Sequence, residues 1–180
     1  AGVAPIAPAM IRLQIRTVCR AFPIAAVKTG MLFSAAIVRA VALEIRRCRL
    51  RNLVVDPVMI ATSGARLLQA DAVACLCGNL LPLARVITPN LPEAEVLAGR
   101  PIRDRAALED AARRIAATYG TACIVKGGHL PGAQVLDVLC TGRRTLVFPA
   151  ARLAVRETHG TGCTFSAALA AGLARGDSLE

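Results

Sequence analysis

Aromatic side chains are scarce in this sequence. Only 3 % of the 180 residues are aromatic and tryptophan is absent, whereas 55 % of the residues are apolar. The core has to be built from Ala, Val, Leu and Ile, a composition that suits helices packed on a buried sheet. This length and apolar content are typical of one compact domain, so we expect a single domain over residues 1–180.

Long apolar runs are also missing, because arginine interrupts each apolar stretch before it reaches the length of a membrane span. Residues 1–8 lack the basic start of a signal peptide. The seven cysteines are odd in number, and Cys75 and Cys77 have no second Cys/His pair at zinc-ligand spacing. We therefore expect a cytoplasmic protein with no membrane partner, no disulfide framework and no zinc site.

The net charge of +10 raises the question of a nucleic-acid partner. The arginines are dispersed, with small clusters in residues 46–51 and 103–105 and no aromatic residues between them. This distribution favours a solvated basic surface over a nucleic-acid interface. Among the 22 basic residues only Lys28 and Lys126 are lysines, and each precedes a glycine turn. A lysine retained in an arginine-rich chain suggests a role for a compact ammonium group.

Hydrophobic periodicity predicts helices that alternate with strands. The predicted helices span residues 8–20, 34–48, 71–80, a short segment from 92, 104–118 and 165–175, with Ser34, Asp71 and Asp104 as N-caps. The predicted strands span residues 25–27, 52–55, 85–88 and 122–126, followed by a β-hairpin of 135–140 and 145–148. The alternation predicts an α/β fold with a mostly parallel central sheet and helices on both faces.

Polar motifs follow most of the predicted strands. They are Lys28–Gly30, Asp56, Thr88–Glu93, Lys126–His129 and Thr158–Cys163. Ligands of such sheets bind beyond the carboxyl ends of the strands, so these motifs are expected to meet at one ligand site.

The motif at residues 160–163 joins a glycine-rich turn to an apolar helical pattern. Gly160 and Gly162 allow positive φ and close approach to a ligand, and the amides at a helix start attract anions. Cys163 at this helix start is either a general base or a buried structural thiol. Lys126 has the charge to neutralise a transferring phosphate.

Two acidic positions have alternative interpretations. Glu93, one helical turn after Asn90, either helps to hold Mg²⁺ near a polyphosphate or is an acid favoured by the helix dipole. Asp56, after a buried strand, either orients a metal or substrate or caps the donor-rich loop of residues 61–64.

Five collinear segments resemble the hydroxymethylpyrimidine/phosphomethylpyrimidine kinases of thiamine biosynthesis, within the ribokinase-like superfamily. The segments are Ala26–Leu32, Val54–Gly64, Thr88–Ala94, Val125–His129 and Thr158–Thr164. The resemblance implies a ribokinase-like fold and ATP-dependent phosphorylation of 4-amino-5-hydroxymethyl-2-methylpyrimidine or of its monophosphate, with ATP and Mg²⁺ as cofactors. We expect a core portion of the family, without its N-terminal and C-terminal ends and with part of the pyrimidine pocket preceding residue 1.

The resemblance also implies roles for individual residues. Gly160, Thr161 and Gly162 are expected to form the anion hole for the transferring phosphate. Cys163 is expected to be the base and to contact the substrate, and Lys126 is expected to approach the nucleotide phosphates. The expected nucleotide-contacting residues are Lys126, Gly128, Thr158 and Asp56, the pyrimidine-contacting residues are Met31 and Val58, and the Mg²⁺ residues are Asn90 and Glu93. The alternatives are a pyridoxal kinase and a non-catalytic nucleotide-binding module, and an exposed sheet edge could support a homodimer.

Overall fold

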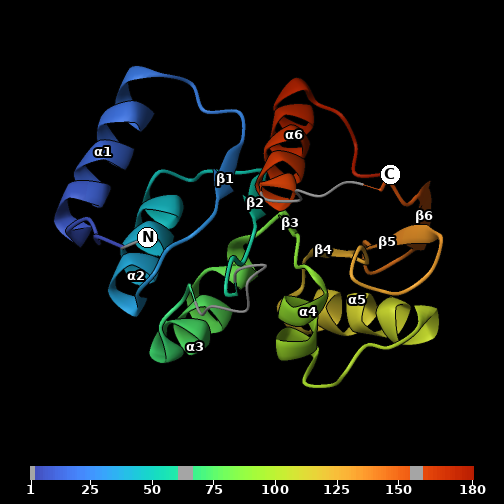
Figure 1. Cartoon of the computed structure of the whole chain (residues 1–180). Coiled ribbons are helices and arrows are strands. Elements are labelled where there is room, and N and C mark those ends of the chain that lie inside the picture. Colours follow the sequence, from blue (N-terminus) through green and yellow to red (C-terminus); the bar gives the residue numbers. More distant parts are fainter. Residues whose placement is uncertain (1–2, 61–66, 155–159) are drawn as a thin grey trace.

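The computed structural model describes residues 3–60, 67–154 and 160–180, which form one mixed sheet flanked by helices (Figure 1). The strands lie in chain order as β1 (Val27–Thr29), β2 (Leu53–Val55), β3 (Val86–Ile87), β4 (Ala122–Lys126), β5 (Gln134–Cys140) and β6 (Thr145–Ala151). β1 to β4 are parallel, and β5 and β6 are antiparallel neighbours at one edge. This confirms the predicted mostly parallel sheet and the hairpin.

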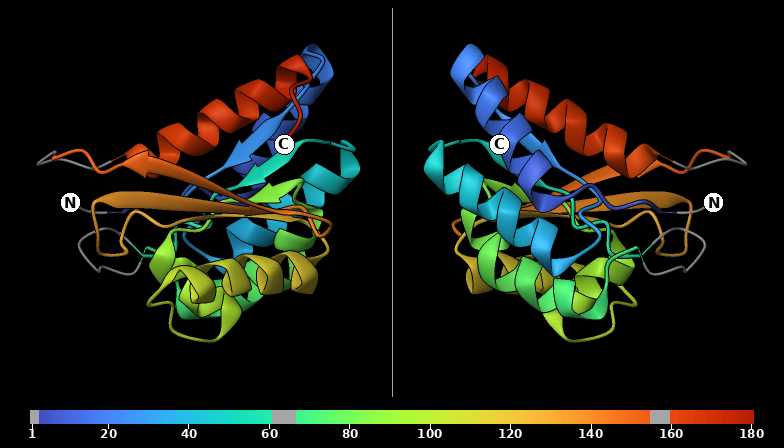
Figure 2. Two further views of the ribbon diagram at one scale, coloured as in Figure 1. Left: turned by 90° about the vertical axis from the view of Figure 1, so that its right-hand side faces the viewer. Right: turned by 90° about the vertical axis from the view of Figure 1, so that its left-hand side faces the viewer.

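The helices occupy both faces of the sheet (Figure 2). They are α1 (Pro8–Ala21), α2 (Ala35–Arg47), α3 (Ala70–Asn79), α4 (Leu91–Ala98), α5 (Arg105–Tyr119) and α6 (Thr161–Arg175), with a 3-10 turn η1 (Leu81–Leu83). α2 to α5 pack on the larger core cluster, which includes Leu53 and Val55, whereas α6 packs on Val54 from the other face. The alternation of β2 side chains between the two cores follows from the period of a strand.

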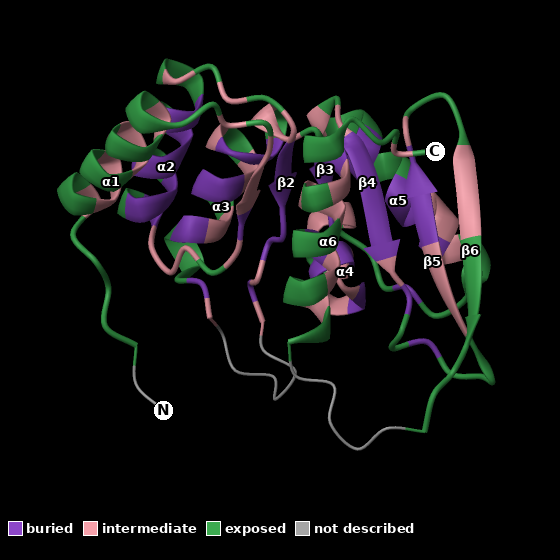
Figure 3. Ribbon diagram, turned by 90° about the horizontal axis from the view of Figure 1, so that it is seen from above, coloured by how far each residue is buried: buried purple, intermediate pink, exposed green. Residues whose placement is uncertain are grey.

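Burial increases toward the middle of the sheet (Figure 3). Each residue of β2 and β3 is buried, whereas most of β6 after Val147 is exposed. Continuous apolar strands of this kind are expected where helices cover both faces. No helix in the described part of the chain has the length and apolar character needed to cross a bilayer.

Local sequence signals explain several helix starts. The Ser34 hydroxyl accepts a hydrogen bond from the Ile37 N–H at 3.4 Å, and the Asp104 carboxylate accepts one from the Ala107 N–H at 2.8 Å. Both N-caps are therefore confirmed. Asp71 is not an N-cap: α3 starts after Gln69, and Asp71 lies in its first turn.

Other predicted boundaries also need correction. The first strand lies at Val27–Thr29, later than the predicted 25–27, because its backbone pairs in parallel register with Leu53–Val55. α6 begins at Thr161 and not at residue 165. The low helix propensity of glycine favoured the later start, but the first turn of the helix includes Gly162.

Candidate active site

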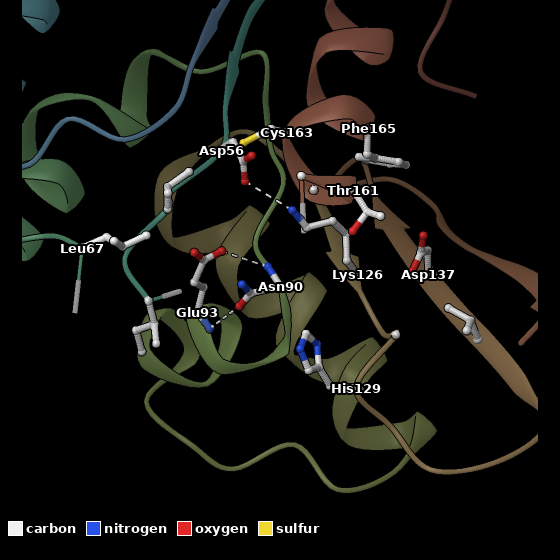
Figure 4. A pocket seen from close by; sticks show the side chains of 16 residues that line it. Asp56, Leu67, Asn90, Glu93, Lys126, His129, Asp137, Thr161, Cys163 and Phe165 are labelled. Atoms are coloured by element: carbon white, nitrogen blue, oxygen red, sulfur yellow. Dashed lines mark hydrogen bonds and ion pairs between the residues drawn. The ribbon is translucent and has the colours of Figure 1, made fainter. Parts of the chain in front are cut away.

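One cavity of about 660 Å³ lies beyond the carboxyl ends of β2, β3 and β4, against the N-terminus of α6 (Figure 4). Most of the residues that the sequence singled out line it. These are Asp56, Val58, Asn90, Glu93, Lys126, Gly128, Gly160, Thr161, Gly162 and Cys163. The ends of parallel strands thus bring together motifs that are up to 107 positions apart (163 minus 56).

Lys126 lies at the centre of this arrangement. Its Nζ is 3.2 Å from Asp56 Oδ1, and a methyl group placed on Gly162 would lie only 3.1 Å from the same Nζ. The ammonium group is therefore held between the end of β2 and the first turn of α6. Its side chain is 15 % exposed, so its interactions are only partly screened by solvent.

Asp56 is oriented from a second side by Ser166. The Ser166 hydroxyl lies 3.1 Å from Asp56 Oδ2 and is completely buried. It is also 3.1 Å from the carbonyl oxygens of Gly162 and Cys163 in the preceding turn. A carboxylate that is 4 % exposed and has both a cation and a hydroxyl partner is well satisfied, so Asp56 fixes the position of Lys126 relative to α6.

The N-terminus of α6 forms the anion-binding side of the cavity. Gly160 is the N-cap, and its φ of 83° lies in the left-handed region that glycine adopts at little cost. No side-chain hydrogen bond caps the helix within the described residues, and its first turn contains no acid. The helix dipole and the nearby Lys126 ammonium therefore both favour a negatively charged ligand here.

Asn90 and Glu93 form a capping box at the start of α4. Asn90 Oδ1 accepts a hydrogen bond from the Glu93 N–H at 2.9 Å, and the Asn90 N–H donates to Glu93 Oε2 at 3.0 Å. The other carboxylate oxygen of Glu93 accepts the Met59 N–H at 3.0 Å. Glu93 therefore lies in the first turn of α4, as predicted, and the capping box is a structural role that the sequence analysis did not foresee. A role of this pair toward Mg²⁺ stays a prediction.

Burial raises the pKa of Glu93, because its side chain is 1 % exposed and desolvation disfavours the charged form. The Asn90 and Met59 N–H groups and the Lys126 charge act in the opposite direction. Burial likewise raises the pKa of Asp137, which also lines the cavity and accepts the Gly127 N–H at 2.9 Å. Carboxyl groups with shifted pKa values beside a cation are typical of functional sites.

The substrate side of the cavity is less complete. Cys163 is exposed and lines the cavity, as a general base requires. Val58 also lines it and has a φ of 44°, a strained conformation for a β-branched residue. Met31 is 40 % exposed and lies outside the described lining, so its pyrimidine contact stays a prediction. Thr158 and the loop 61–64 fall outside the described residues.

Sequence reasoning missed several residues of the site. Ser166 and Asp137 were not singled out, nor were the apolar lining residues Leu67, Val135 and Phe165. The spacing of Ser166, one helical turn after Gly162, is a weak signal that could have identified it, since positions four apart share a helix face. The apolar residues carry no local signal, because their place in the cavity depends on how the strands and loops pack.

The fold defines a ribokinase-like α/β domain, and its cavity lies at the carboxyl edge of the sheet beside Lys126 and the N-terminus of α6. The whole chain, residues 1–180, matches the family described as phosphomethylpyrimidine kinase. The chain belongs to this family.

Three similar proteins illustrate the relationship. The hydroxymethylpyrimidine/phosphomethylpyrimidine kinase of Rhizobium meliloti is 45 % identical over 99 % of this chain and 67 % of its own length. The thiamine biosynthesis bifunctional protein of Geobacter sulfurreducens is 42 % identical over 99 % of this chain and 36 % of its own length. Among solved structures, the ADP complex of Bacillus subtilis pyridoxal kinase superposes with a TM-score of 0.90 at 36 % identity, over 99 % of this chain and 66 % of that one. The chain thus spans between 36 % and 67 % of the length of these three proteins.

Proposed function

We propose that this chain carries the phosphoryl-transfer site of an ATP-dependent kinase of 4-amino-5-hydroxymethyl-2-methylpyrimidine, or of its monophosphate, in thiamine biosynthesis. Membership of the phosphomethylpyrimidine kinase family supports the substrate class. The observation that carries the proposal is the position of Lys126, paired with Asp56 at 3.2 Å and packed against Gly162 at the start of α6. Phosphoryl transfer depends mainly on positioning and charge neutralisation, and this arrangement offers both.

In this mechanism the chain's own residues have separate tasks. The first turn of α6, with Gly160, Thr161 and Gly162, holds the transferring phosphate, and Lys126 neutralises the charge that develops on it. With the hydroxymethyl substrate, Cys163 acts as a thiolate and accepts the hydroxyl proton as that oxygen bonds to the γ-phosphorus of ATP, while the bond to the β-phosphate oxygen breaks and ADP leaves. With the monophosphate, a phosphate oxygen attacks and no hydroxyl proton has to be removed. Gly128 and Asp56 border the nucleotide side, together with the predicted contact from Thr158.

Mg²⁺ fits this site as an ion held mainly by substrate phosphates. Within the described residues no three His, Cys, Asp or Glu side chains come together as a metal cage. Mg²⁺ keeps several waters and commonly needs only one or two protein carboxylates beside phosphates. Glu93 and Asn90 provide oxygen atoms at the cavity for this purpose, and the bound ion would neutralise phosphate charge.

A coupled assay tests the proposal. The chain is incubated with Mg-ATP and hydroxymethylpyrimidine, whose hydroxyl is the phosphoryl acceptor, and release of ADP is measured. Cys163→Ala should lower kcat by about 10²-fold or more, because general bases contribute about 10²–10⁴-fold. Cys19→Ala, which removes a thiol on α1, is the matched control and should retain the activity. Full turnover by Cys163→Ala would rule out the base assignment, whereas ATP binding without any transfer would favour a non-catalytic module.

The pyridoxal kinase alternative is not favoured, since the family and the curated relatives are named for the pyrimidine substrate. The similarity to a solved pyridoxal kinase nevertheless makes a direct comparison worthwhile. With pyridoxal and hydroxymethylpyrimidine at equal concentration, we expect the pyrimidine product to dominate. Dominant pyridoxal phosphate formation would reverse the assignment.

A further inference from the structure

The loop of residues 127–132, directly after β4, is held by a guanidinium group from outside the cavity. Arg152 follows the last residue of β6, and its side chain reaches across to this loop. Its Nε donates to the Gly132 carbonyl at 2.8 Å and its Nη1 donates to the Gly128 carbonyl at 2.8 Å. Its Nη2 donates to the Leu130 carbonyl. One side chain thus binds three alternate carbonyl oxygens of a single loop.

Both ends of this connection are themselves fixed. The Arg152 N–H donates to the Ala133 carbonyl at 2.9 Å, which continues the pairing of β5 with β6. Within the loop, the Leu130 N–H donates to the Gly127 carbonyl at 2.9 Å, and the Leu130 side chain is buried in the larger core. The guanidinium therefore connects a fixed strand end to a loop whose base is also fixed.

The part of the loop between these anchors lines the cavity. Gly128 and His129 are exposed and contribute to its lining next to Lys126, and the His129 ring is drawn among the lining side chains in Figure 4. Gly127 and Gly128, which separate Lys126 from His129, give the backbone many accessible conformations. The hydrogen bond from Arg152 to the Gly128 carbonyl restricts this freedom at the edge of the cavity.

The hydrogen bond to Gly128 also orients the next peptide group. The described chain has no cis peptide bond, so the Gly128 carbonyl and the His129 N–H point in opposite directions. A carbonyl turned toward Arg152 turns the His129 N–H away from the guanidinium. A planar guanidinium with five donors in a fixed fork can hold several carbonyls at once, which a lysine ammonium cannot do with the same geometry.

We propose that Arg152 is a positioning residue of the nucleotide side of the site, acting through the 127–132 loop to hold Gly128 and the His129 backbone beside Lys126. The ligand class is a phosphate-bearing nucleotide, and this part rests on the proposed function. The ordering of the loop does not depend on that function. Arg152 itself touches no reacting atom in this scheme.

The test compares Arg152→Gln and Arg152→Lys with Arg143→Gln, which removes a charge from the turn at the opposite end of the same hairpin. Amide hydrogen exchange of residues 127–133, the KM for ATP, kcat and calorimetric binding of a non-hydrolysable ATP analogue are measured. Because hydrogen bonds from charged donors are stronger than neutral ones, we expect Arg152→Gln to speed exchange in the loop and to raise KM by about tenfold. We expect kcat to change by less than about threefold.

The remaining outcomes are also decisive. Arg152→Lys should show intermediate values, and Arg143→Gln should match the unmodified chain. Unchanged loop exchange and unchanged analogue affinity in Arg152→Gln would overturn the proposal, as would loss of the circular-dichroism spectrum of a folded protein in both Arg152 variants. If the unmodified chain transfers no phosphate, the proposed function fails, while loop exchange and analogue binding still decide the role of Arg152.

Discussion

At the scale of single residues, Glu93 combines a structural task with a place in the candidate site. Its two carboxylate oxygens accept the N–H groups of Asn90 and Met59, which ties the start of α4 to the segment after β2. The same side chain lines the cavity and is almost completely buried. A substitution of Glu93 should therefore lower the stability of the fold, independently of any effect on catalysis.

We expect Glu93→Gln to lower the free energy of unfolding by about 1–3 kcal/mol, because the amide NH₂ of glutamine cannot accept the backbone N–H that the carboxylate oxygen accepted. Urea unfolding at pH 7 measures the change. Glu109→Gln on α5, where the carboxylate pairs with Arg105 at 2.8 Å on the surface, is the control and should cost less than about 1 kcal/mol. Equal stability of Glu93→Gln and the unmodified chain would contradict the capping role.

The sequence predicted those site residues whose chemistry follows from a local pattern. Lys126 was recognisable as a rare lysine before two glycines, and Cys163 as a thiol at a helix start. Ser166 had only the weak signal of its spacing from Gly162, and Arg152 had no local signal. Their roles depend on contacts with residues 110 positions away for Ser166 and 20 to 24 positions away for Arg152. Such contacts are set by strand order and register, which no local pattern specifies.

At the scale of elements, α1 is attached to the rest of the fold by charge as well as by apolar contact. It has no buried residue, and it lies outside α2 in Figure 1. Arg12 Nε donates to Glu44 Oε1 at 2.8 Å, and Arg16 donates to both Glu44 oxygens at 2.6 and 2.8 Å. Ile11 and Ile15 add apolar contact with the core.

This attachment should depend on pH. The hydrogen bonds from Arg16, and next the one from Arg12, lower the pKa of Glu44 from 4.5 to about 2, although burial opposes the shift. A carboxyl group whose pKa is lower in the folded state stabilises the fold above pH 4.5, and this contribution is lost as the pH falls toward 2. α1 is therefore the helix expected to loosen in this acidic window.

We predict that Glu44→Gln is less stable than the unmodified chain at pH 6 and that the difference shrinks toward pH 2, since protonation removes the same charge. Unfolding by urea across this range, with hydrogen exchange in α1, provides the measurement. Glu109→Gln is again the control. A difference that stays constant down to pH 2 would show that the ion pairs with Arg12 and Arg16 do not stabilise α1.

Element types were largely predictable, whereas their ends were not. The caps Ser34 and Asp104 were correct because their side chains lie at the helix start and meet N–H groups three residues on. The prediction that Asp71 is an N-cap was wrong, because it lies in the first turn of α3. The helix dipole favours an acid in the first turn as well, so an acid at either position gives a similar sequence signal. The first strand was placed too early because Lys28 and Thr29 belong to it through pairing with β2, not through hydrophobicity.

At the scale of the whole molecule, strand order explains why the site exists. β2, β3 and β4 are parallel neighbours, so their carboxyl ends lie at the same edge of the sheet. Asp56 directly follows β2, Asn90 lies shortly after β3, and Lys126 is the last residue of β4. The Lys126 N–H donates to the Pro89 carbonyl at 2.9 Å, which sets Asn90 beside Lys126. α6 packs on the face of the sheet opposite to α2–α5, and its N-terminus lies at this edge (Figure 2). We propose that these elements converge on a phosphoryl-transfer site organised around Lys126.

The two lysines of the chain provide the most direct test of that claim. In the ADP-release assay with hydroxymethylpyrimidine, we predict that Lys126→Met lowers kcat by about 10²–10³-fold, the loss typical for removing one group that stabilises transition-state charge. Lys28→Met, on β1 and outside the described cavity lining, should stay within about twofold of the unmodified chain. Equal kcat values for Lys126→Met and Lys28→Met would contradict the role of Lys126 in phosphoryl transfer.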